Sequence, residues 1–98
     1  MPIVAVFKSP SLTRETYEES IRALTGGRKT QVDTPADWPV EGLLVHAAGE
    51  GPNGFCVVDV WESQEAFDRF GEKLGPIMET IGVVIEPETY ETHTLVST

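Results

Sequence analysis

The chain has 98 residues, and its 7 lysines and arginines against 16 aspartates and glutamates give a net charge of −9. A chain of this length is expected to form one domain, residues 1–98, with a core that can enclose a small ligand but leaves little spare stability. Nucleic acid and anionic membranes are excluded as expected partners, because both need a basic face.

A single cysteine, Cys56, rules out an internal disulfide and a multi-cysteine zinc site. It lies in an apolar run, where a buried structural thiol is expected. The first eight residues lack a basic segment followed by a signal-type apolar stretch, and their apolar run is far shorter than the ~20 residues of a membrane span. We therefore expect a cytoplasmic protein.

The first half of the chain predicts a strand and a helix. Residues 3–8 are apolar and β-branched and end at a Ser-Pro-Ser turn, which is typical of a strand. Tyr17, Ile21 and Leu24 then repeat at helical spacing, with Thr13 as the N-cap and Gly26-Gly27 as the end of the helix.

Residues 28–40 are polar and contain two prolines, so we expect a loop that carries Trp38 as its one large aromatic residue. Whether Trp38 covers a pocket or only anchors the loop stays open at this point. Two apolar runs follow, residues 43–48 and 55–61, and the Asn53-Gly54 pair between them predicts a β-hairpin.

The second helix is expected to start after Ser63, because apolar residues then recur every three or four positions on one face. Gly75-Pro76 should kink or interrupt this helix, since proline removes a donor and clashes one turn back. Gly82 is expected to close it. Alternation from Glu88 to Val96 predicts a last strand.

The resulting βαββαβ order predicts a ferredoxin-like α+β fold, a four-stranded antiparallel sheet with both helices on one face. In its usual strand order, which is fourth, first, third and second along the chain, the strands 43–48 and 88–96 lie at opposite edges. Exposed sheet edges need protection, and pairing of these two edges between two chains would supply it.

The hairpin also predicts which side chains share a face of the sheet. One face carries chemically varied residues, and the other is smooth and apolar. Because neither face is suited to water, we expect a homodimer that covers the face without helices. The varied face is expected to hold Leu44, His46, Ala48, Phe55, Val57, Asp59 and Trp61, and the smooth face Leu43, Val45, Ala47, Cys56, Val58 and Val60.

His46 and Asp59 are the ionisable members of the varied face. In apolar surroundings, burial raises the pKa of a carboxylic acid and lowers that of an imidazole unless the two pair, so such a setting can tune a proton-transfer pair. A structural interpretation is equally available, in which the two side chains only satisfy each other or the nearby backbone.

The stretch Val58-Asp59-Val60-Trp61-Glu62-Ser63-Gln64-Glu65-Ala66-Phe67, with the βαββαβ order, resembles the dimeric α+β barrel superfamily, and within it the branch of antibiotic-biosynthesis-monooxygenase-like proteins. The resemblance covers most of the chain, but its specific motif covers about ten residues. It implies the ferredoxin-like fold and a homodimer. It does not by itself imply an activity, because one fold hosts many functions.

The resemblance also implies a pocket between the sheet and the helices. Trp61 matches a strand-end tryptophan that points into the ligand pocket of several relatives, which would turn the varied face toward the helices. Tyr17 and Phe67 would then lie across a pocket that also contains His46 and Asp59. Phe70 stands where a histidine is frequent in the family, and Phe7 stands where heme-degrading members have an asparagine. These departures weigh against a heme ligand and against a standard monooxygenase, and no cofactor is expected.

A metal site is not expected either. His46 and His93 would lie on opposite edges of the sheet, and pairing of edges between chains could bring them together, yet the chain has no closely spaced histidine pair. It also lacks a phosphate-binding glycine loop and a Gly-x-Ser-x-Gly elbow.

Three functions remain open from the sequence. The first is a small-molecule-binding protein on the dimeric barrel, with a small apolar or aromatic ligand. The second is a cofactor-independent monooxygenase for a small aromatic or polyketide-like substrate, with His46 or Asp59 as base and Trp61 against the ring. The third is a structural dimer whose pocket is filled by its own side chains, such as Phe67, Phe70 and Leu74.

Overall fold

A computed structural model describes residues 1–27, 38 and 40–96. The loop expected at 28–40 therefore lies outside the described residues, apart from Trp38 and Val40. The elements, in chain order, are β1 (Ile3–Phe7), α1 (Arg14–Leu24), β2 (Leu43–Gly51), β3 (Gly54–Trp61), α2 (Gln64–Ile81) and β4 (Glu88–Glu91).

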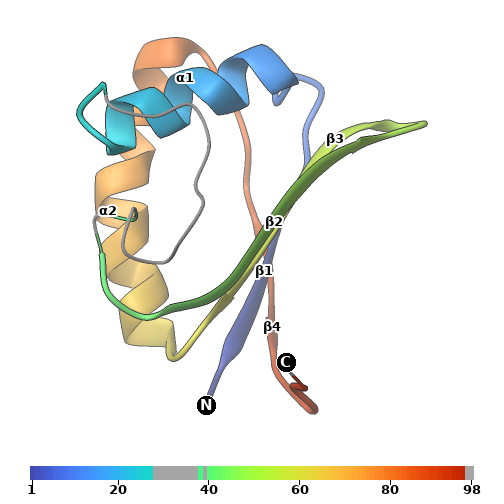
Figure 1. Cartoon of the computed structure of the whole chain (residues 1–98), viewed down its shortest axis with the longest axis vertical. Coiled ribbons are helices and arrows are strands. Elements are labelled where there is room, and N and C mark those ends of the chain that lie inside the picture. The colour runs from blue at the N-terminus through green and yellow to red at the C-terminus, as the bar shows by residue number, and fades with distance from the viewer. Residues whose placement is uncertain (28–37, 39, 97–98) are drawn as a thin grey trace.

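The four strands form one antiparallel sheet in the order β2-β3-β1-β4. Both helices lie on the same side of this sheet, and the described part of the chain places no helix on the other side (Figure 1). The ferredoxin-like α+β fold, the strand order and the edge positions of β2 and β4 predicted from the sequence are confirmed.

The start of α1 is fixed by a reciprocal pair of threonines. The Thr16 amide donates to Thr13 Oγ1 at 3.2 Å, and the Thr13 amide donates to Thr16 Oγ1 at 2.8 Å. This capping box satisfies two of the backbone donors that a helix leaves free at its N-terminus. Thr13 is thus the N-cap, as predicted, and the helix carries Tyr17 in its second turn.

The helix α2 runs from Gln64 to Ile81 without interruption, so of the kink or interruption predicted at Gly75-Pro76, the interruption is wrong. One obstacle to a helical proline is the clash of its ring with the Cβ of the preceding residue, and Gly75 has no Cβ. Ser63 caps the N-terminus by accepting a hydrogen bond from the Ala66 amide at 3.1 Å, and Gly82 closes the helix at a positive φ of 80°, both as predicted.

The last strand is shorter than predicted, because β4 covers only Glu88–Glu91 rather than residues 88–96. It pairs with β1 alone, and β1 begins at Ile3. One further backbone hydrogen bond joins the Thr92 amide to the Pro2 carbonyl at 3.0 Å. Alternating side chains beyond this point therefore have no partner strand to pair with.

The two faces of the sheet differ as the alternation predicts, with one correction. On β1, Ile3, Ala5 and Phe7 are buried toward the helices, whereas Val4 and Val6 are half-buried on the other face. On β2, the register shifts between Leu43 and Val45. This bulge turns Leu43 into the core and leaves Leu44 exposed, the reverse of the predicted assignment.

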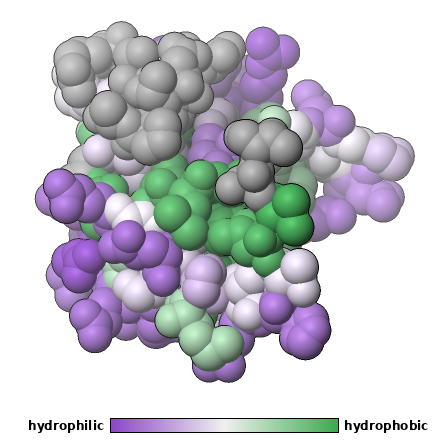
Figure 2. Space-filling view, turned by 60° about the horizontal axis from the view of Figure 1, so that its bottom comes forward, coloured by the Kyte–Doolittle hydropathy of each residue, from purple (hydrophilic) through white to green (hydrophobic). Residues whose placement is uncertain are grey.

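The face without helices carries mainly apolar side chains from all four strands. They are Val4, Val6, Val45, Ala47, Cys56, Val58, Val60 and Tyr90. Seen from the lower side of the view in Figure 1, the molecule presents a continuous apolar area bordered by hydrophilic residues (Figure 2). Neither described helix combines the length and hydropathy that crossing a bilayer requires.

Candidate functional site

The candidate site is built where β2 and β3 pair beneath α1. His46 on β2 and Asp59 on β3 are direct partners in the register, so their side chains leave the sheet side by side toward the helices. Tyr17 reaches them from α1. Three elements that are far apart in the sequence thus supply one polar cluster between the sheet and the helices.

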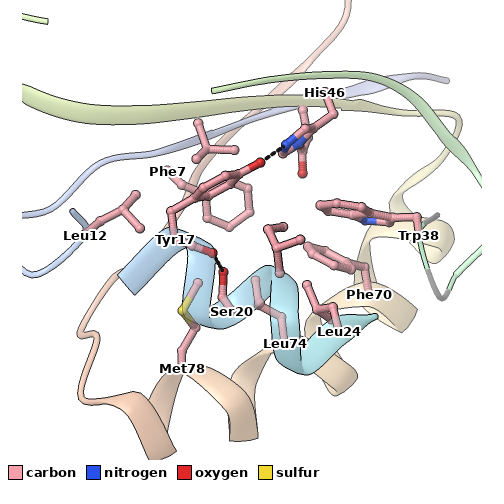
Figure 3. Close-up of a pocket in the computed structure, with 13 residues that line it drawn as sticks. Phe7, Leu12, Tyr17, Ser20, Leu24, Trp38, His46, Phe70, Leu74 and Met78 are labelled. Atoms are coloured by element: carbon pink, nitrogen blue, oxygen red, sulfur yellow. Dashed lines mark hydrogen bonds and ion pairs between the residues drawn. The ribbon is translucent and has the colours of Figure 1, made fainter. Parts of the chain in front are cut away.

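These three side chains form a continuous hydrogen-bonded relay. His46 Nδ1 lies 2.6 Å from Asp59 Oδ1, and His46 Nε2 lies 2.6 Å from Tyr17 Oη (Figure 3). The side chain of Asp59 is 1% exposed and that of His46 is 9% exposed. Both imidazole nitrogens therefore have a partner, and the relay runs from a buried carboxylate to a phenol.

The chemistry of the three groups sets the direction of the relay. An ionised carboxylate only accepts, so Nδ1 of His46 carries a hydrogen and donates it to Asp59. In the neutral imidazole, Nε2 then accepts the hydrogen of the Tyr17 hydroxyl. A proton passed from Tyr17 to Nε2 would form an imidazolium that the Asp59 carboxylate stabilises.

Tyr17 itself stays a phenol over the physiological range. Burial and the nearby negative charge of Asp59 raise the pKa of its hydroxyl from 10.0 to about 12. It is therefore a hydrogen-bond donor to His46, and its oxygen retains a lone pair with which it can accept a hydrogen bond from another group.

An aromatic wall stands beside the relay. Trp38 lies over His46, with ring centroids 4.7 Å apart, and stacks on Phe70 at 5.4 Å. Trp61 stacks on Phe70 at 4.9 Å. The indole N–H groups of Trp38 and Trp61 are both buried and have no hydrogen-bond partner among the described residues. Buried donors without acceptors are rare in proteins, and each of these two N–H groups could still donate one hydrogen bond.

A small cavity of about 30 Å³ lies against the relay. Figure 3 shows Tyr17, Trp38 and Phe70 around it, with Leu74 and Met78 reaching it from α2. This volume exceeds the roughly 10–15 Å³ that one water molecule needs. The space at the relay therefore admits a small polar group, such as a hydroxyl.

The structure brings together three of the five predicted pocket residues. Tyr17, His46 and Asp59 line the small cavity, and the prediction that the His46/Asp59/Trp61 face turns toward the helices is confirmed. Trp61 is 0% exposed and packs on Phe70 rather than lining the cavity. Phe67 contacts Phe7 and lines a different cavity, described below.

Sequence reasoning missed two features of this site. The hydroxyl of Tyr17 bonds directly to His46, whereas the sequence placed it only across a pocket. Trp38 belongs to the cavity wall, where the sequence left its role open. The signal for Tyr17 was its place on the apolar face of α1, but spacing along a helix does not tell which strand residue it meets.

No group of three histidine, cysteine, aspartate or glutamate side chains suited to a metal ion occurs within residues 1–27, 38 and 40–96. His93 is exposed and follows the end of β4.

No protein-family model, curated protein or solved structure matched the chain. The fold and the site define a ferredoxin-like α+β protein with a Tyr-His-Asp relay between the sheet and the helices.

Proposed function

We propose that this protein binds a small apolar or aromatic molecule that carries a hydroxyl group, and that Tyr17, His46 and Asp59 hold that group. The relay is the observation that carries the proposal. Burial of a carboxylate costs free energy even when it is paired, and an apolar pair at these strand positions would stabilise the sheet at least as well. A polar relay that ends at a cavity therefore contributes more to ligand binding than to the stability of the fold.

The size of the small cavity supports this ligand chemistry. A hydroxyl fits the space of about 30 Å³ and can donate to the free lone pair of Tyr17 Oη. The buried indole N–H of Trp38, in the wall of the same cavity, supplies a donor for an oxygen. The protein thus offers a donor and an acceptor to one polar group of the ligand, and the rest of the cavity wall is mainly apolar. This is the usual composition of a small-molecule site.

Binding of 1-naphthol tests this proposal, because its fluorescence responds to a hydrogen-bonded, apolar environment. A lost hydrogen bond of about 0.5–1.5 kcal/mol corresponds to roughly a two- to tenfold loss of affinity. Tyr17→Phe and His46→Ala should each weaken 1-naphthol by at least this much. His93→Ala, which changes the exposed histidine, is the matched control. Equal affinity in the Tyr17 and control variants would contradict the proposal.

A second candidate, a cofactor-independent monooxygenase, is favoured by the direction of the relay. A substrate proton taken up by the Tyr17 oxygen would move the phenol proton to His46, and Asp59 would stabilise the resulting imidazolium. The substrate carbanion would then react with O₂, one oxygen atom becoming a carbonyl and the other leaving as water. Oxygen uptake with anthrone that His46→Ala leaves unchanged would rule out this candidate.

The proposal includes a homodimer of the dimeric α+β barrel type. The sheet face away from the helices is apolar, and Tyr90 on it is 51% exposed. Apolar faces of this kind on small proteins mark interaction surfaces, and a second copy offers a matching one. The exposed edges of β2 and β4 would pair across the same interface.

We place the protein in the cytoplasm, where the free thiol of Cys56 would stay reduced.

A further inference from the structure

A second and larger cavity opens between α2 and the chain segment that leads to β4. Its volume is about 470 Å³, within the range of roughly 300–1,000 Å³ that small-molecule sites occupy. It lies on the helix side of the sheet, so a dimer formed through the other face would leave it free. Its walls include Phe7, Phe67, Gly71, Gly75, Val83 and Ile85.

Two glycines inside α2 keep this cavity open. Gly71 and Gly75 are one helical turn apart, and glycine destabilises a helix interior relative to alanine. A Cβ built at either position meets no atom within 4 Å. Packing therefore does not require glycine at these positions, and the missing side chains leave space along the helix.

The outer wall of the cavity is held in place by Ser11. The Val84 amide donates to Ser11 Oγ at 2.9 Å, and Ser11 Oγ donates to the Val84 carbonyl at 3.2 Å. These two bonds tie the segment after α2 to the loop before α1, 73 residues away. The protein's own hydrogen bonds thus hold this wall in place, and a wall that is already ordered lowers the entropic cost of binding.

The walls define the chemistry of an occupant. Among the described residues that line the cavity, Glu79 is the only charged one, and the chain as a whole carries −9. An anionic ligand would meet repulsion with no cation to offset it. Aromatic and aliphatic side chains make up most of the remaining wall, so the fitting ligand is uncharged and apolar.

This cavity adjoins the one at the relay. Phe7, Phe70, Leu74 and Met78 line both, so they form a shared wall. Met78 is unbranched and rotates easily, which makes it the adaptable member of that wall. A molecule whose hydroxyl enters the small cavity needs room for its apolar body, and the larger cavity lies directly behind the shared wall.

We propose that the glycine-lined cavity along α2 binds the uncharged, apolar body of the ligand whose hydroxyl group meets Tyr17. The assignment of the cavity to an uncharged apolar molecule depends on its walls alone. The link to Tyr17 rests on the function proposed above.

Two fluorescent probes that differ by one charged group test the cavity. N-phenyl-1-naphthylamine is neutral, and 8-anilino-1-naphthalenesulfonate is the same ring system with a sulfonate. We expect saturable binding of the neutral probe, at least tenfold tighter than that of the sulfonate. Absence of saturable binding of the neutral probe would overturn the proposal, and equal affinity of the two probes would overturn the assigned ligand class.

Variants that fill the cavity with a side chain show whether the probe binds there. Gly71→Leu places a side chain in the open space and should weaken the neutral probe at least tenfold, and Gly71→Ala should give a smaller loss. The control Glu72→Leu adds the same side chain one position further along α2, outside the cavity walls, and should bind as the native chain does. Far-ultraviolet circular dichroism checks that each variant is folded. Unchanged affinity in a folded Gly71→Leu variant would overturn the proposal.

The same variants separate this inference from the function proposed above. Gly71→Leu should weaken 1-naphthol and N-phenyl-1-naphthylamine alike, whereas Tyr17→Phe should lower the affinity of 1-naphthol relative to the other probe. If only Gly71→Leu weakens binding, the result supports the cavity as the binding site and contradicts the proposed role of the relay. If only Tyr17→Phe weakens binding, the result supports the role of the relay and contradicts the cavity as the binding site.

Discussion

His46 and Asp59 face each other across β2 and β3 with Nδ1 and Oδ1 2.6 Å apart, and Asp59 is almost fully buried. The strand register alone places them together, so no loop is needed to assemble the pair. Rigid elements hold functional groups more accurately than loops do. The pair therefore holds a fixed position, and Tyr17, which is more exposed, bonds to it through His46.

Removing His46 should destabilise the protein more than neutralising Asp59. His46→Ala leaves a buried carboxylate without its partner, which costs about 3–5 kcal/mol of the free energy of unfolding. Asp59→Asn keeps an acceptor for the imidazole N–H and should cost about 1–3 kcal/mol. Urea unfolding measures both, with the exposed His93→Ala expected within about 0.5 kcal/mol of the native chain. The opposite order of the two variants would contradict a charged relay.

Tyr17 should make the fold sensitive to alkaline pH. Its pKa is about 12 in the folded chain and 10.0 without the fold, so the folded state holds the phenol proton more tightly. The corresponding stability is complete below pH 10 and is lost as the pH rises through about 12. Tyr17→Phe should remove this part of the decline, as unfolding measured across the pH range would show.

Asp59 should control part of the same pKa shift. Its carboxylate is the second cause of the raised Tyr17 pKa after burial, so Asp59→Asn should lower that pKa toward 10 without reaching it. The phenolate absorbance reports it, in a Tyr90→Phe background because the chain has two tyrosines. A Tyr17 pKa unchanged by Asp59→Asn would show that the carboxylate is not charged in the relay.

Gly42 and Gly54 form a matched pair that separates backbone strain from crowding. Their φ angles are 111° and 116°, both in the region that favours glycine. A Cβ on Gly42 would lie 2.6 Å from the Cβ of Ala66 on α2, whereas a Cβ on Gly54 meets nothing within 4 Å. Gly54→Ala should cost about 1–2 kcal/mol, and Gly42→Ala about 1–3 kcal/mol more. Equal thermal stability of the two variants would contradict the close approach of Gly42, which precedes β2, to Ala66 on α2.

The homodimer can be tested by a charge on the apolar sheet face. Val58 is half-buried near the middle of that face, and Val58→Lys should convert a dimer into a monomer in light-scattering measurements at micromolar concentration. Gln64→Lys adds the same charge at an exposed position on the helix side and should leave the dimer intact. A native chain that is monomeric under these conditions would contradict the dimer.

The sequence predicted the architecture well because local signals agree with the fold. The Thr13 and Ser63 caps and the Gly82 helix end each act within a few residues, and each is confirmed. The predicted hairpin also forms, but its two-residue turn is Pro52-Asn53, and Gly54 already pairs with Gly51 as the first residue of β3. The failures arise from tertiary context. The bulge at Leu43 and Val45 changes the face of Leu44, and periodicity carries no signal for a bulge.

The site was only partly predictable for the same reason. Strand alternation was enough to place His46 and Asp59 on the same face of the sheet, and the register of the structure makes them direct neighbours. The contact with Tyr17 depends on how α1 lies over the sheet, and the larger cavity depends on what glycines at 71 and 75 leave empty. Neither property is encoded in the spacing of residues along one element.

Nitrogen-15 NMR of the histidine side chains tests the central claim most directly, because the chain has two histidines and His93 is exposed. The relay predicts that His46 holds one tautomer, with the hydrogen on Nδ1 and Nε2 accepting from Tyr17. Addition of 1-naphthol should then shift the Nε2 signal of His46 and leave His93 unchanged. A His46 that exchanges between tautomers as His93 does, and that does not respond to 1-naphthol, would contradict the relay and its role in binding.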